Sequence, residues 1–262
     1  MTYVIGAPDR ERHVFQEEGP DVTRKRSIIK SWPVACIVFL SVAAASAYTG
    51  RPVTGGGSIS GTARAPGAKP PPAITVRKDV AVCKKSHQPE TVVVGPDGTL
   101  ANVVVYLKDI ATGKPVNAAA KSSLDNKGCA YVPHVAVVPV GSTLTIHSSD
   151  NVLHNVHALM GSDTLFNVAL PLPGMQIPQT MKKPGIVSVK CDAGHTWMAA
   201  TIHVVEHPYY AVTDAAGKFD LKDVPPGTYT LVAWHESLGT QEQKVTVAAG
   251  KPATASFTYA AK

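Results

Sequence analysis

The chain has 262 residues, of which 44% are hydrophobic and 17% are charged, and its formal net charge is +6. These values indicate an ordinary globular protein of one or two domains, and the scattered lysines favour a solvated basic surface over a nucleic-acid footprint. With 21 glycines, 21 prolines and no long stretch of 3.6-residue period, the sequence predicts an all-β architecture.

Residues 1–47 are expected to be an N-terminal extension followed by a signal peptide. A positive segment contains Arg24, Lys25, Arg26 and Lys30, an apolar run follows at 32–45, and Ala45-Ser46-Ala47 fits the small-residue cleavage rule. The apolar run is shorter than the roughly 20 residues that a spanning helix needs. We therefore expect cleavage after Ala47 and export to the periplasm or the cell exterior. Membrane association is expected only if this segment stays uncleaved as an anchor.

The remaining chain reads as a series of short strands. Residues 48–57 are a Gly-rich linker, and strands are expected at 58–63, 74–76, 91–94, 102–107, 131–140, 142–147, 185–191 and 200–205. In the strand at 142–147, Leu144 and Ile146 are expected to point inward. Residues 169–181 contain three prolines and a glycine and are expected to be a loop. From residue 209 onward, strands and turns alternate every 8–12 residues, which predicts a β-sandwich.

The cysteines predict one disulfide and one free thiol. Cleavage removes Cys36, and two of the remaining three cysteines should pair in an oxidising compartment. Cys83 and Cys129 lie in polar, turn-like surroundings, and we expect them to form the bridge, which would stabilise the fold by about 3–4 kcal/mol. Cys191 then remains unpaired. It is either a metal ligand or a buried cysteine that acts as a small hydrophobe.

Residues 187–204, VSVKCDAGHTWMAATIHV, read as a strand, a tight loop and a second strand. Alternation places Cys191 on the same strand face as Val187 and Val189, at the inner end of a buried face. The loop then offers His195 as an imidazole ligand and Met198 as a weak thioether ligand. A thiolate, imidazoles and a long axial methionine form the ligand set that selects copper for electron transfer.

Such a site needs a second imidazole, which the segment SDNVLHNVH at 149–157 supplies. This segment offers two candidates, His154 and His157, which lie three residues apart and so point to opposite faces of a strand. His157 could replace His154 as the ligand if the turn is distorted.

Two stretches carry a family resemblance. GSTLTIHSSDNVLHNVH at 141–157, together with KCDAGHTWM at 190–198, resembles the cupredoxins, the plastocyanin-like blue copper proteins. The resemblance implies a Greek-key β-sandwich that holds one copper ion, Cu(I) or Cu(II), through His154, Cys191, His195 and Met198. The match is closest to an exported group with the motifs GC-x-Y-x-PHV, SD-x-x-LHNVHA and Cys…His-x-Trp-Met. That group usually has two residues between Cys and His, whereas this chain has three, which puts the spectral type in doubt.

The tail resembles the carboxypeptidase-regulatory-like, or transthyretin-like, family through TDAAGKFDL and DVPPGTYTLVAWHE. The opening strand expected for that family, G-x-I-x-G, stands far upstream at 57–61. We therefore expect a split second small sandwich, made of 58–113 and 208–262, into which a cupredoxin-like domain at 114–207 is inserted. Two domains in tandem are the alternative.

The resulting functional hypothesis is an exported mononuclear copper protein that transfers single electrons to a redox partner, such as an exported cytochrome or oxidoreductase. No enzyme is expected, because the chain lacks a Ser-His-Asp order, a zinc-protease helix and a phosphate loop, and methionine closes the metal position. The alternatives are a surface- or carbohydrate-binding structural module and a copper capture or delivery protein.

Overall fold

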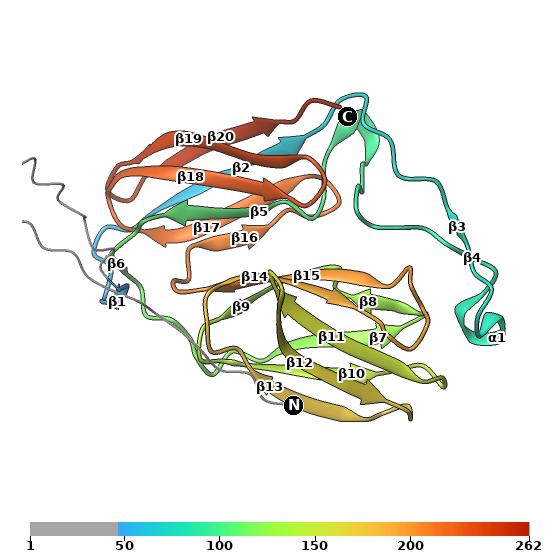
Figure 1. Ribbon diagram of the computed structural model, residues 1–262. Coiled ribbons are helices and arrows are strands. Elements are labelled where there is room, and N and C mark those ends of the chain that lie inside the picture. The colour runs from blue at the N-terminus through green and yellow to red at the C-terminus, as the bar shows by residue number, and fades with distance from the viewer. Residues whose placement is uncertain (1–46, 262) are drawn as a thin grey trace, which may run out of the picture. The chain divides into compact units, whose positions relative to one another are not determined.

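The computed structural model describes residues 47–261, and the predicted extension and signal peptide lie outside this range except for Ala47. The regular secondary structure of the described part is almost entirely strand, so the all-β prediction is confirmed (Figure 1). Its helical elements are a four-residue helix, α1 (Val80–Cys83), and a short 3-10 turn, η1 (Pro96–Gly98). No helix between residues 47 and 261 is long and apolar enough to cross a membrane.

The first sandwich comprises two sheets whose strands lie between residues 122 and 205. One sheet is four-stranded, in the order β13 (Gln176–Thr180), β10 (Thr143–Ser148), β7 (Ser122–Lys127) and β8 (Ala130–Val132). The other is five-stranded, in the order β12 (Asp163–Leu170), β11 (His154–Met160), β14 (Gly185–Lys190), β15 (Ala199–Val205) and β9 (Val135–Pro139). Alternating side chains from both sheets form one apolar core.

Strand β10 illustrates how the sequence pattern makes this core. Leu144 and Ile146 are fully buried, whereas Thr143 is exposed and Thr145 is half-buried. The inward orientation predicted for the two apolar side chains is therefore confirmed. Ser148, the last residue of β10, is buried on the same face.

The loop predicted at residues 169–181 is partly wrong, because it contains strand β13. Pro178 lies within this strand opposite Thr145 of β10. β13 is the edge strand of its sheet, so a residue without an N–H can sit there without breaking a ladder on both sides. The loop was predicted from the number of prolines alone, and that number does not show whether a strand lies at the edge of a sheet.

Two predicted strands also differ from the structure. The single strand predicted at 131–140 is divided at Pro133 and His134 into β8 and β9, which belong to different sheets. Residues 91–94 form no strand and contribute only one isolated bridge, from Val94 to Leu100. Alternation along the sequence could not reveal the change of sheet in the first case, because both halves are apolar.

The second sandwich is built from strands that precede and follow those of the first sandwich in the chain. Its four-stranded sheet has the order β16 (Tyr210–Val212), β5 (Val104–Lys108), β18 (Gly227–His235) and β19 (Gly239–Val247). Its three-stranded sheet has the order β17 (Lys218–Val224), β2 (Gly57–Arg64) and β20 (Pro252–Thr258). β2 runs parallel to β20 and has glycines at 57 and 61. A Cβ at Gly61 would collide with the Ala255 carbonyl, which explains the G-x-I-x-G pattern.

A segment between β2 and β5 projects to the first sandwich. We call residues 74–88 the tethered arm. It contains β3 (Ile74–Thr75), α1 and β4 (Ser86–His87). Cys83 at the end of α1 forms a disulfide with Cys129 of the turn between β7 and β8, which confirms the predicted bridge and leaves Cys191 as the free cysteine of the described residues.

Candidate metal centre

The candidate ligands meet at one end of the first sandwich. Cys191 directly follows β14, where Val187 and Val189 are buried on the same face, and it begins the loop at residues 191–198, here called the Cys–Met loop. His154 is the first residue of β11, and β11 pairs with β14 through His157 and Lys190. Antiparallel pairing in this register brings the start of β11 level with the loop.

One atom from each of three side chains converges there. His154, Cys191 and His195 have possible ligand atoms within 4.8 Å of one another, and all three residues are buried. The Cys191 Sγ lies 3.8 Å from the His195 Nδ1, and the two imidazole rings are 4.8 Å apart between centroids. The structure thus brings together three of the four residues that the sequence proposed, in a candidate His/Cys metal site.

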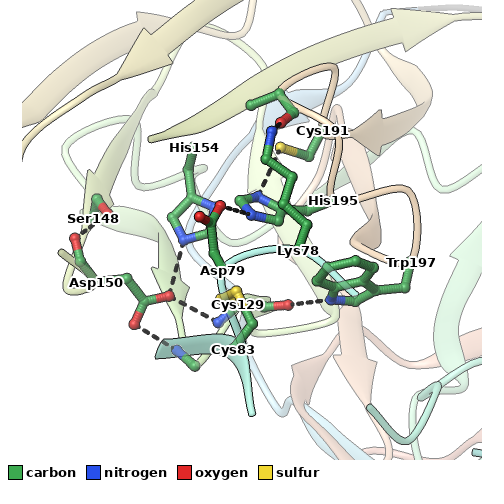
Figure 2. The surroundings of a disulfide bond; sticks show 12 residues. Lys78, Asp79, Cys83, Cys129, Ser148, Asp150, His154, Cys191, His195 and Trp197 are labelled. Carbon is green, nitrogen blue, oxygen red and sulfur yellow. Dashed lines mark hydrogen bonds and ion pairs between the residues drawn. A yellow bond between two sulfur atoms is a disulfide. The ribbon is translucent and has the colours of Figure 1, made fainter. Parts of the chain in front are cut away.

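Each imidazole is oriented by a carboxylate on its far side. The His154 Nε2 donates to Asp150 at 2.9 Å, and the His195 Nε2 donates to Asp79 at 2.8 Å (Figure 2). The His195 Nδ1 is therefore available to the Cys191 thiol, and the His154 Nδ1 is left without a hydrogen-bond partner among the described residues. Pairing of a ligand histidine with a carboxylate is the usual way in which proteins select the tautomer that binds a metal.

The Nδ1 of His154 gives the clearest sign that this cluster binds something. It is fully buried and has no hydrogen-bond partner among residues 47–261. A buried nitrogen without a partner is costly, and a metal ion would satisfy it. Burial lowers the pKa of His154, although Asp150 opposes this shift, so the imidazole is kept neutral and able to donate its lone pair.

Asp150 is itself held by the turn that carries the disulfide. Its Oδ1 accepts from the Gly128 N–H and its Oδ2 from the Cys129 N–H, both at 2.8 Å. The carboxylate therefore accepts three hydrogen bonds, including the one from His154. Asp150 was part of the quoted SD-x-x-LHNVHA motif, but the sequence did not show that this aspartate would orient the histidine four residues later.

Met198 occupies the end of the Cys–Met loop. It is 2% exposed, its N–H donates to the His195 carbonyl at 2.9 Å, and its side chain belongs to the same apolar core as Cys191. Trp197 lies 5.2 Å from the His195 ring and donates its indole N–H to the Cys129 carbonyl at 3.0 Å. Both side chains thus help to form an apolar shell around the cluster.

His157, the alternative first ligand, lies on the other face of β11. Its Nδ1 contacts Asp192 at 2.6 Å and its Nε2 contacts Thr164 at 2.8 Å. It is therefore separate from the buried group that contains His154. Alternation along the strand explains this arrangement, since residues three apart point to opposite faces.

Asn155 and Tyr131 support the loop and were not singled out by the sequence. The Asn155 side chain accepts the Asp192 N–H at 3.0 Å, which fixes the residue after Cys191. The Tyr131 hydroxyl donates to the Asn155 carbonyl at 2.5 Å. Burial, followed by the nearby Cys191, raises the pKa of Tyr131, so this phenol remains a donor.

Comparison with known proteins gives two likenesses. Residues 186–260 match the family model described as Carboxypeptidase regulatory-like domain. This range begins within β14, so it includes the Cys–Met loop as well as the later strands of the second sandwich. No protein with a curated description matches the chain.

Solved structures similar to this chain include a cupredoxin, an amicyanin and a copper-containing nitrite reductase. A purple cupredoxin from Nitrosopumilus maritimus shares 23% identity over 32% of this chain and 99% of that chain, with a TM-score of 0.28. Amicyanin from Paracoccus versutus shares 18% identity over 38% of this chain and 97% of that chain, at 0.30. A Cu-containing nitrite reductase from Thermus scotoductus shares 22% over 37% of this chain but only 25% of that chain, at 0.29.

Both resemblances expected from the motifs recur in these comparisons, and the chain itself combines two β-sandwiches. The TM-scores are below 0.5, so the chemistry of the site rests on its own side chains. A thiolate, two imidazoles and a thioether from the same loop as the thiolate are the donors that suit copper in electron-transfer proteins. These residues fit such an ion.

Proposed function

We propose that this chain is an exported mononuclear copper protein that transfers single electrons. The observation that carries the proposal is the convergence of possible ligand atoms from His154, Cys191 and His195 within 4.8 Å, with each imidazole hydrogen-bonded to a carboxylate. A bound copper ion would supply a one-electron couple between Cu(I) and Cu(II). The thioether of Met198 would be a weak donor that tunes this couple.

The protein's part is to hold the donors in place and exclude water. Asp150 and Asp79 set the tautomers, and the backbone N–H groups of the turn at 128–129 hold Asp150. The three converging side chains are at most 5% exposed. A rigid and dry site favours electron transfer, because the donors need not rearrange when the charge of the metal changes.

The same geometry argues against one alternative, a copper capture or delivery protein. A copper capture or delivery protein would use the same ligands, but it should release its metal readily. Both histidines here are fully buried and hydrogen-bonded to carboxylates, which favours retention. The four donors also leave no obvious position for a substrate, so we propose a carrier without substrate turnover. Its partner would be a redox protein, such as an exported cytochrome or oxidoreductase.

Export is supported by the Cys83–Cys129 disulfide, because such bridges persist in oxidising compartments. The intact mass of protein recovered outside the cytoplasm tests this part of the proposal. A chain that begins at Tyr48 is expected. A mature chain that still contains Trp32 would mean that the segment is an anchor.

The decisive experiment is the visible absorption spectrum of the full chain after addition of Cu(II). An intense thiolate-to-copper band is expected; a chemical reductant should bleach it and reoxidation should restore it. Cys191→Ser should lack the band while keeping its fold, as judged by far-UV circular dichroism. A wild-type protein without the band contradicts the proposal, and rapid loss of copper to a chelator would favour capture or delivery.

A further inference from the structure

The tethered arm reaches the Cys–Met loop from outside the first sandwich. It lies in the chain between β2 and β5, both strands of the second sandwich, and the Cys83–Cys129 disulfide fastens it to the turn between β7 and β8. Figure 2 shows Lys78, Asp79 and the disulfide beside the candidate ligands. The arm therefore carries side chains to the site that neither sandwich could supply.

Asp79 makes the more important of these contacts. Its Oδ2 accepts the His195 Nε2–H at 2.8 Å. The His195 side chain is 0% exposed, whereas Asp79 is 35% exposed, so the carboxylate lies between the imidazole and solvent. The other described side chains that contact His195 are Cys191, His154 and Trp197, so Asp79 is the carboxylate among its neighbours that can hold the Nε2–H tautomer.

The backbone of the arm suits this role. Asp79 has the left-handed conformation, with φ 50° and ψ 37°, and precedes α1 without capping it through its side chain. Its carbonyl instead accepts the N–H groups of Val82 and Cys83, at 2.9 and 2.8 Å. The single helical turn thus links Asp79 directly to the disulfide cysteine, and it leaves the carboxylate free to bind His195.

Lys78 covers the loop next to Asp79. Its Nζ donates to the Ala193 carbonyl. Gly194 has φ +91°, and a Cβ there would lie 2.9 Å from the Lys78 Nζ. Ala193 and Gly194 belong to the three-residue connection between Cys191 and His195, which is one residue longer than usual in the group that the chain resembles. The arm therefore contacts the part of the loop where the sequence departs from that group.

We propose that Asp79 is a positioning residue for His195, held over the Cys–Met loop by the disulfide-locked arm. It keeps the Nδ1 of His195 turned toward Cys191 and His154, and the arm limits access to the loop. The role at a bound ion rests on the proposed copper function. The covering of the loop does not, because the contacts exist without a metal.

The first test compares copper binding by Asp79→Ala, Asp79→Asn and Asp97→Ala. Asp97 is a matched control, because it is also an exposed aspartate with positive φ, 58° against 50°, but it lies in η1. Loss of a carboxylate behind a ligand histidine typically weakens metal binding about 10–100-fold. We expect that loss and an altered visible band for Asp79→Ala, a smaller loss for Asp79→Asn, which keeps an acceptor oxygen, and wild-type behaviour for Asp97→Ala. Wild-type affinity and an unshifted band in Asp79→Ala would overturn the assignment.

The second test uses metal-free protein and measures alkylation of Cys191 by a thiol reagent, read by peptide mass spectrometry so that each cysteine is followed separately. Cys191 is 5% exposed with the arm in place. The rate should rise severalfold in Asp79→Ala and in the double variant Cys83→Ser/Cys129→Ser, and stay unchanged in Asp97→Ala. An unchanged rate in Asp79→Ala and in a folded double variant would overturn the covering role. If wild-type protein binds no copper, the proposed function is wrong. The alkylation rate of Cys191 still tests whether the arm covers the loop, because it is measured without metal.

Discussion

The first and second sandwiches are built from similar strands, but their buried polar side chains make different contacts. In the second sandwich, the Thr213 hydroxyl donates to the Leu100 carbonyl at 2.8 Å and accepts the Val103 N–H at 3.0 Å. The Tyr259 hydroxyl donates to the Ala233 carbonyl at 2.8 Å. These side chains satisfy neighbouring backbone groups, which is the ordinary structural use of a buried polar atom.

In the first sandwich, His154 is held on one side and left available on the other. It donates from Nε2 to Asp150, while its Nδ1 has no partner among the described residues. This histidine also has a possible ligand atom within 4.8 Å of those of Cys191 and His195. The comparison indicates that an oriented, unsatisfied side chain that meets other possible ligands marks the candidate site, whereas buried polarity alone does not.

The largest effect is expected for the ligand histidine. His154→Ala should remove one of two imidazole donors, and we expect strongly weakened copper binding with a lost or displaced visible band. His157→Ala is the matched control, because it lies on the same strand but contacts Asp192 and Thr164 instead. Copper titration followed by absorption measures both. The assignment of the first ligand is wrong if His157→Ala destroys the band and His154→Ala leaves it.

The next effect concerns Asp150, which serves both folding and the site. Asp150→Ala leaves the N–H groups of Gly128 and Cys129 and the Nε2–H of His154 without their acceptor. We expect the free energy of unfolding of the metal-free protein to fall by about 2–5 kcal/mol, measured with urea. Copper affinity in the folded protein should fall about 10–100-fold.

Thr213→Val provides the counterpart in the second sandwich. It removes two hydrogen bonds to backbone groups at nearly constant volume, so a loss of about 1–3 kcal/mol is expected. The copper spectrum should not change. If Thr213→Val altered the spectrum as much as Asp150→Ala, the proposed difference between the two sandwiches would not hold.

A further prediction uses His203, a buried polar side chain of the first sandwich that is not a ligand candidate. It is 5% exposed, packs 4.4 Å from the Trp234 ring, and burial lowers its pKa from 6.5 to about 4. Between pH 6.5 and about 4, His203 is protonated in the unfolded chain but neutral in the folded chain. The free energy of unfolding should therefore fall as the pH drops toward 4. Over that pH range His203 should account for a loss of about 3 kcal/mol in the free energy of unfolding.

Urea unfolding of metal-free protein at pH 7 and at pH 4.5 checks this sign, with His203→Gln as the control that removes the titrating group. The variant should lose less stability than the wild type on acidification. An equal loss in both proteins would show that other groups cause the acid sensitivity. The copper spectrum at pH 7 should be the same in both.

The smallest effect is expected for Met198→Leu. Leucine keeps the buried apolar volume but removes the weak donor, so copper should remain bound by the thiolate and imidazoles. Since the lost donor favours the oxidised ion, the reduction potential should rise, by about 59 mV for each tenfold change in relative affinity. Redox titration of the visible band measures it. An unchanged potential would place Met198 outside the donor set.

Local sequence was enough to predict much of the candidate site. Cys191, His195 and Met198 lie within one loop, and alternation in the preceding strand fixed the face of Cys191. The choice of His154 over His157 followed from the resemblance to the cupredoxin motif, while the two-residue period placed the two histidines on opposite faces. The disulfide followed from the number of cysteines left after cleavage, and the all-β fold from the spacing of turns.

What the sequence could not predict depends on contacts between distant residues. Asp79 lies 116 residues before His195, and no pattern around it indicates a partner. His134 is likewise buried, at 6% exposure, and contacts the Ala199 carbonyl and Glu236, which no local pattern indicates. In both cases the partner comes from a different part of the fold, and only the three-dimensional arrangement supplies it.

The split of the second sandwich has a consequence for the order of folding. β2 pairs with β20, so Ser58 meets Pro252 only after nearly the whole chain has been made. Closing so long a loop is slow and costs entropy unless the intervening chain is already compact. The strands of the first sandwich lie between these partners, and the Lys114 N–H and Tyr209 hydroxyl join its two ends at 2.7 Å. Early collapse of the first sandwich would therefore act as a template that brings the two parts of the second sandwich together.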